Sequence, residues 1–104
     1  MEEIRCKGKT YEVTEEQYNR IEALMEKAAE EVRERQQDIA DARFERMKED
    51  IAERARQKNE GLHGAALDSV VEKALKEFGG VLKVETEEAI ATELEDYKEH
   101  LLTR

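Results

Sequence analysis

Alternating apolar and polar positions near the start of the chain predict a β-hairpin over residues 4–13. Gly8-Lys9 suits a two-residue type II′ turn, because the first turn position needs a positive φ. This register pairs Lys7 with Thr10, Cys6 with Tyr11, Arg5 with Glu12 and Ile4 with Val13. It therefore places Ile4, Cys6, Tyr11 and Val13 on one face, which needs a further element to cover it.

A run without glycine or proline then predicts one long helix over residues 14–60. Thr14 and Gln17 have the spacing of a capping box, in which each side chain accepts a hydrogen bond from the other residue's backbone N–H. Gly61 is expected just beyond the helix, in the left-handed conformation. The polar segment Gln36–Asp38 is where we expect the helix to break, if it breaks at all.

The apolar stripe of this helix changes register near its middle. Tyr18, Met25, Val32 and Ile39 recur every seven residues, whereas Phe44, Met47, Ile51 and Ala55 follow at steps of three and four. A shift of this kind locally unwinds a supercoil or turns the helix toward another neighbour.

Three further elements are predicted in the rest of the chain. A helix over residues 65–78 carries an amphipathic pattern and is expected to stop at Gly79-Gly80. Residues 81–85 indicate a short third strand, and Thr86 is expected to cap a last helix over 86–102. The predicted fold is α+β and mostly helical, with element order β-β-α-α-β-α in a single domain over residues 1–104.

The length of the first helix favours self-association. At about 1.5 Å per residue, a helix of about 45 residues is roughly 65–70 Å long, whereas a compact domain of about 100 residues has a radius of gyration of about 13 Å. Part of its apolar stripe would therefore need a second chain, and a symmetric dimer is the simplest form. The expected interface consists of Met25, Val32, Ile39, Phe44, Met47 and Ile51. The alternative is a break near Gln36, which gives a monomeric helical hairpin.

Composition favours binding to a basic protein. The formal net charge is -9, and 38% of the residues are hydrophobic against 43% charged. Nucleic-acid binding relies on Lys and Arg, so the acidic balance disfavours it. The last predicted helix offers an anionic face of Glu87, Glu88, Glu95, Asp96 and Glu99, which could occupy a basic groove or could simply be solvated.

An alternative hypothesis uses arginines of the long helix. Arg35 and Arg46 share a helix face, as do Arg43 and Arg54, and paired helices could place them around a nucleotide or another small anion. Ordinary ion pairs with acids four residues away would also explain these arginines.

Little in the sequence indicates catalysis, a metal site or a cofactor. The familiar zinc, phosphate-loop and dinucleotide spacings are missing, and His63, His100 and Cys6 are explained by exposure, helix capping and burial. No run is apolar enough for a membrane span, and the start lacks signal-peptide features, so we expect a cytoplasmic protein. A single cysteine excludes an intrachain disulfide.

These observations favour a non-catalytic, acidic interaction protein that is oligomeric through its long helix. It would bind and block a protein partner, as an inhibitor or antitoxin-like protein does. A small-anion binder and a structural coiled-coil module are the alternatives.

Overall fold

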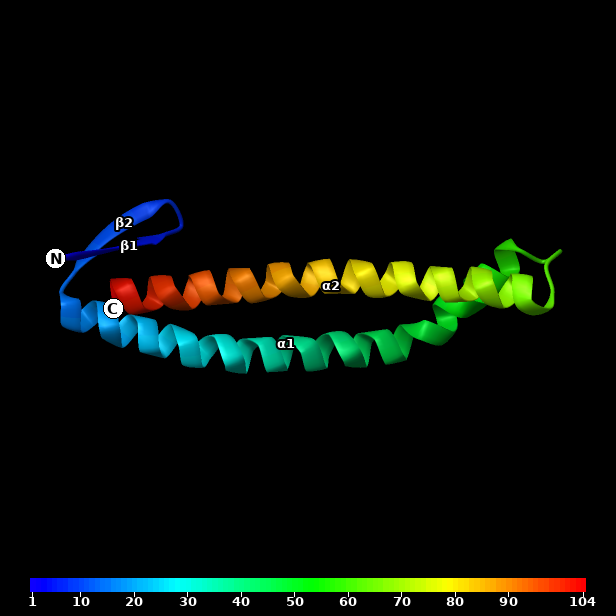
Figure 1. Ribbon diagram of the computed structural model, residues 1–104, viewed down its shortest axis with the longest axis horizontal. Helices are drawn as coiled ribbons and strands as arrows, with labels where there is room; N and C mark the ends of the chain where they lie inside the picture. Colours follow the sequence, from blue (N-terminus) through cyan, green and yellow to red (C-terminus); the bar gives the residue numbers. More distant parts are fainter. The chain divides into compact units, whose positions relative to one another are not determined.

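Two helices and one β-hairpin make up the protein. The computed structural model describes residues 1–104. Its elements are β1 (Glu2–Cys6), β2 (Lys9–Val13), α1 (Glu15–Lys58) and α2 (Gly64–Thr103), shown in Figure 1. The mostly helical class and the N-terminal hairpin are confirmed. The predicted element order is wrong, because the chain runs β-β-α-α.

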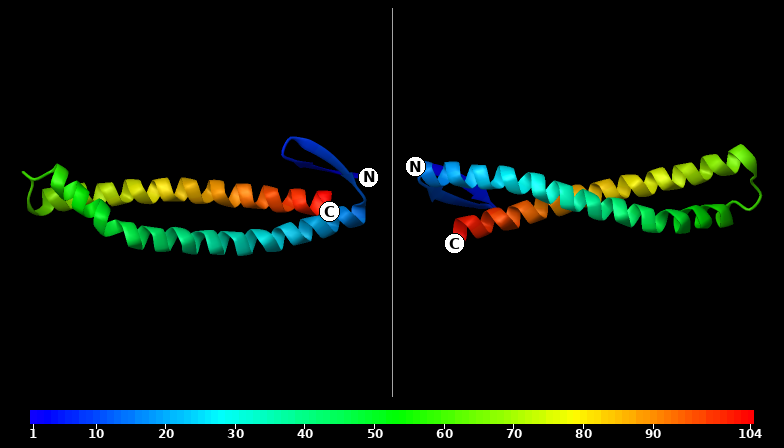
Figure 2. Two further views of the ribbon diagram at one scale, coloured as in Figure 1. Left: turned by 180° about the vertical axis from the view of Figure 1, so that it is seen from behind. Right: turned by 90° about the horizontal axis from the view of Figure 1, so that it is seen from below.

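Contacts divide the chain into two compact units. Unit 1 comprises Met1–Gln36 and Glu87–Arg104, and unit 2 comprises Gln37–Thr86. Unit 1 therefore contains the hairpin, the first part of α1 and the last part of α2. Unit 2 contains the remaining segments of α1 and α2 and the connection between them. Both views in Figure 2 show this connection, which joins the end of α1 to the start of α2.

The hairpin exists, but its predicted register is wrong by two residues. Lys7 and Gly8 form the turn with φ of 50° and 78°, and two positive values are typical of a type I′ turn. Ile4 consequently pairs with Tyr11, and Glu3 pairs with Glu12. Side chains alternate with a period of two, so this shift leaves the predicted faces unchanged. Ile4, Cys6 and Val13 are buried on the expected face.

The observed register places two carboxylates directly opposite each other, at Glu3 and Glu12. Like charges in this arrangement destabilise a strand pair. We expect Glu12→Lys to stabilise the protein by about 0.2–1 kcal/mol, because it creates an opposite-charge pair. Urea denaturation followed by circular dichroism measures the gain. The double variant Glu3→Lys/Glu12→Lys again places like charges opposite each other, so it should lose this gain in stability. An equal gain in stability in the single and double variants would contradict the register.

The start of α1 is the predicted capping box. The Thr14 backbone N donates to Gln17 Oε1 at 2.9 Å, and the Gln17 backbone N donates to Thr14 Oγ1 at 3.1 Å. The helix then continues without a break through Gln36–Asp38. It ends where the Asn59 side-chain amide donates to the Ala55 carbonyl at 2.8 Å. The left-handed glycine of the connection is Gly64 rather than Gly61.

The prediction that residues 65–78, 81–85 and 86–102 form helix, strand and helix is wrong, because α2 continues across Gly79-Gly80. The pattern of covered positions explains why: Leu75, Phe78, Leu82, Thr86 and Ile90 follow one another at steps of three and four, and Leu82 and Ile90 are buried. Thr86 does not cap a helix. Its hydroxyl donates to the Leu82 carbonyl at 2.7 Å, a bond typical of threonine inside a helix.

Each unit has its own small core. In unit 1, Ile4 and Val13 of the hairpin pack with Ile21 of α1, and Leu101 and Leu102 of α2 cover this cluster. The hairpin thus gains the covering helices that a two-stranded sheet needs.

In unit 2, the rings of Phe44 and Phe78 stack with centroids 5.9 Å apart. A Cβ on Gly79 would lie 3.8 Å from Phe44, so the glycine sits directly beside this ring. Ala52, Ala55 and Leu82 are the buried residues of this unit.

Candidate binding surfaces

Ion pairs and hydrogen bonds attach the hairpin turn to the last part of α2. The Lys7 ammonium lies 2.6 Å from Asp96 and 3.3 Å from Glu99, and its backbone N donates to Glu95 at 3.2 Å. In return, the Lys98 ammonium donates to the Arg5 carbonyl at 3.2 Å. Figure 1 shows the hairpin beside this end of α2. The Asp96 and Glu99 carboxylates raise the pKa of Lys7.

Cys6 is buried between the hairpin and the last part of α2. Its side chain is 2% exposed, and its thiol lies 3.5 Å from the Glu95 carbonyl. Burial, followed by the nearby Glu95 carboxylate, raises the pKa of the thiol. The thiolate is the reactive form, so Cys6 is held in its unreactive state.

Acid should weaken the attachment. The Lys7 backbone N–H and the Lys98 ammonium hold the pKa of Glu95 below its ordinary value of 4.5. Since its pKa is lower when folded, Glu95 contributes stability above about pH 4.5 and loses it as the pH falls through the folded value. We expect the melting temperature to fall over this range, and less steeply in Glu95→Gln. Melting curves from pH 6 to pH 3 measure this, and parallel curves for both proteins would contradict it.

Most of the predicted anionic face is neutralised within the chain. Glu95, Asp96 and Glu99 hold the hairpin, and Glu87 lies 3.6 Å from Arg33 of α1. Glu88 is exposed and has no ion pair. These five residues do share one segment of α2, but four of them have intrachain partners.

The predicted anion site is divided between the units. Arg35 pairs with Glu93 in unit 1, where Gln36 also donates to Glu93 at 3.0 Å. The Arg35 guanidinium, then the Gln36 amide, lowers the pKa of Glu93. In unit 2, Arg43 lies 2.8 Å from Glu85, and Arg54 lies 2.9 Å from Asp50. Arg46 is exposed and forms no ion pair.

The predicted oligomer interface is largely occupied by the chain's own packing. Val32 is buried, Met25 packs against the unit 1 cluster, and Phe44 stacks on Phe78. Met47 and Ile51 are half-buried. Ile39 is the exception, with 54% of its surface exposed.

A second acidic surface lies on α1 and was not predicted. Glu22, Glu26, Glu30 and Glu34 follow at intervals of four residues, so they lie along one side of the helix. We call these four residues the carboxylate ridge. All four are exposed, and none forms an ion pair or a hydrogen bond with another side chain. The four-residue spacing was the signal in the sequence that could have identified the ridge.

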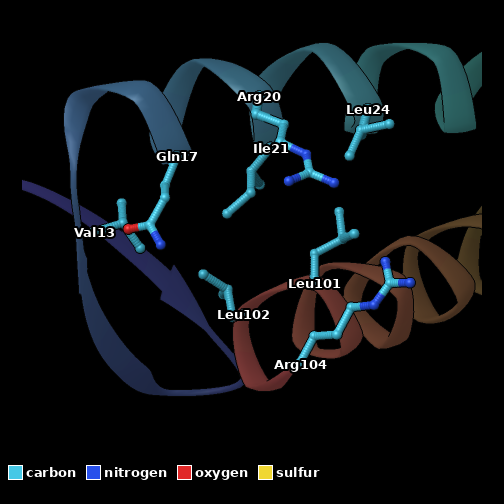
Figure 3. Close-up of a pocket in the computed structure, with 8 residues that line it drawn as sticks. All are labelled: Val13, Gln17, Arg20, Ile21, Leu24, Leu101, Leu102 and Arg104. Atoms are coloured by element: carbon cyan, nitrogen blue, oxygen red, sulfur yellow. The ribbon is translucent and has the colours of Figure 1, made fainter.

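A groove of about 340 Å³ opens beside the hairpin in unit 1. Val13, Ile21, Leu24, Leu101 and Leu102 provide apolar walls. Figure 3 shows the Arg20 side chain extending from α1 into the opening between α1 and α2, and the Arg104 side chain lying along α2 at the edge of this opening. Neither arginine has a carboxylate within 4.0 Å.

No group of three or more histidine, cysteine or acidic side chains is arranged to hold a metal ion. Neither α1 nor α2 has an apolar stretch of the length and hydropathy that a membrane span requires. Comparisons with protein-family models, with characterised proteins and with solved structures gave no match.

Proposed function

We propose that this protein is a non-catalytic interaction protein that binds a basic protein surface through the carboxylate ridge of α1. It acts by occupying that surface, as a small inhibitor does. The observation that carries the proposal is the contrast between the two acidic surfaces. Four of the five acids of the predicted anionic face on α2 pair with Lys7, Lys98 or Arg33, whereas none of the four ridge carboxylates has an intrachain ion pair.

Electrostatics supports this choice of partner. Like charges four residues apart on a helix destabilise it by about 0.2–0.5 kcal/mol per pair. Lysine or arginine side chains of a partner would relieve this repulsion. A chain with net charge -9 also attracts a basic partner at long range, which raises the association rate.

Affinity capture from a native extract at low salt tests the proposal. The bait is the tagged protein, and the ridge variant carries Glu→Gln at all four ridge positions. We expect the wild type to retain a basic protein that the ridge variant does not retain. Glutamine keeps the shape and the helix propensity of glutamate, so the folded units should persist.

A matched control separates the ridge from net charge. Glu49, Glu60, Glu72 and Glu77 are exposed residues of unit 2, and their replacement by glutamine removes the same number of charges. This control should retain the partner. Equal loss of the partner from both variants, or the absence of any basic protein bound to the wild type, would overturn the proposal.

Self-association is a second candidate role, favoured by the exposed apolar side chains of unit 2. Ile39 and Val81 are each 54% exposed and Val84 is 59% exposed. Val81 and Val84 are three residues apart, so they lie on the same side of α2. A second copy of the chain would cover them.

Light scattering coupled to gel filtration measures this self-association. We expect the wild type at about twice its monomer mass of 12.1 kDa, and a triple variant with glutamine at positions 39, 81 and 84 at 12.1 kDa. A wild-type mass of 12.1 kDa at high micromolar concentration would exclude the dimer.

A further inference from the structure

The groove of unit 1 combines an apolar interior with two cations. Its volume of about 340 Å³ lies near the lower end of the range of about 300–1,000 Å³ that holds small ligands. Residues distant in the sequence form it, because Val13 follows the hairpin, Ile21 and Leu24 belong to α1, and Leu101 and Leu102 belong to α2.

The arginines of this groove differ from most others in the chain. Arg35, Arg43 and Arg54 each pair with a carboxylate. Arg20 and Arg104 lack such a partner, although 27 of the 104 residues are acidic. Both line the same groove as Ile21, Leu24 and Leu101, Arg20 from α1 and Arg104 from the end of α2 (Figure 3).

We propose that this groove binds a small amphipathic anion, namely a free monocarboxylate with a saturated chain of about ten carbons. The alkyl chain lies against Ile21, Leu24 and Leu101, where burial of apolar surface stabilises it by about 25 cal/mol per Å². The carboxylate accepts hydrogen bonds from Arg20 and Arg104, whose planar guanidinium groups match its two oxygens. The size of the groove favours such a ligand over a folded protein.

This site is independent of the carboxylate ridge, because its charges are positive and its interior is apolar. Loss of basic-partner binding therefore does not affect the proposal, and the reverse also holds.

Isothermal titration calorimetry with sodium decanoate, below its micelle concentration, tests the groove. We expect saturable binding with one site per chain. Arg20→Gln and Arg104→Gln should each weaken it about tenfold, as expected for the loss of a charge-assisted hydrogen bond. Both arginines are outside the buried core, so these variants should remain folded.

Arg46→Gln is the matched control, because Arg46 is an exposed arginine of α1 with no ion pair and lies outside the groove. It should bind decanoate like the wild type. Butyrate has the same carboxylate without the long chain, and decanol has the chain without the charge, so both should bind much more weakly. No binding of decanoate, equal binding of decanol, or equal affinity of all three arginine variants would overturn the proposal.

Discussion

Replacement of Ile21 by alanine is expected to destabilise the protein by about 2–4 kcal/mol, because the residue lies at the centre of the unit 1 core. Its side chain is 7% exposed and packs with Ile4 and Val13 of the hairpin. Truncation removes buried methyl groups and leaves a cavity that the neighbours fill only in part. Since the core cluster of this unit is small, the loss should be large relative to its total stability.

Thermal and urea denaturation followed by circular dichroism measure this loss. Ile39→Ala, compared at a concentration at which both proteins are monomeric, is the matched control, because it makes the same substitution in the same helix at a side chain that is 54% exposed. We expect it to change stability by no more than about 0.5 kcal/mol. Equal losses for Ile21→Ala and Ile39→Ala would contradict the packing described for unit 1.

Replacement of Val84 by proline is expected to destabilise the protein by about 3 kcal/mol. Val84 lies inside α2, where proline removes a backbone hydrogen bond and its ring clashes with the preceding turn. The valine side chain is 59% exposed, so little of the effect comes from lost packing. The same denaturation experiments provide the measurement.

Two companion variants distinguish a helix from the strand predicted over 81–85. At a concentration at which the protein is monomeric, Val84→Ala should be neutral or slightly stabilising, because alanine favours a helix. Gly80→Ala should stabilise by about 1 kcal/mol, since no atom lies within 4 Å of the added Cβ. Destabilisation by both substitutions would instead favour the strand and its preceding glycine turn.

The sequence predicted those features of the structure that depend only on residues close together in the chain. The capping box of Thr14 and Gln17, the faces of the hairpin and the long first helix all depend on neighbouring residues. The hairpin register was not fixed in this way, because a shift of two residues leaves every side chain on the same face.

The second helix shows where local signals failed. Gly79-Gly80 and a run of valines and leucine indicated a stop followed by a strand, but packing overrides weak local preferences. The covered positions from Leu75 to Ile90 keep helical spacing across the glycines, and Phe44 packs beside Gly79. The length of the first helix predicted a second chain along its apolar stripe, whereas Val32 and Phe44 of that stripe are covered within this chain.

The candidate sites required long-range information. The predicted acidic face and arginine set consist largely of residues that form ion pairs within the chain. These ion pairs could be predicted only if it were known which helical segments face each other. The groove could not be predicted, because it joins residues from both ends of the sequence. The carboxylate ridge is local and could have been identified from its spacing.

Titration of a labelled lysine-rich helical peptide tests the central claim most directly, because it asks whether the position of the charges, rather than their number, determines binding. Fluorescence anisotropy at low salt should show that the wild type and the unit 2 control bind with similar affinity. The ridge variant should bind at least about tenfold more weakly, as expected for the loss of several ion pairs. Equal weakening in the ridge variant and the control would contradict the claim.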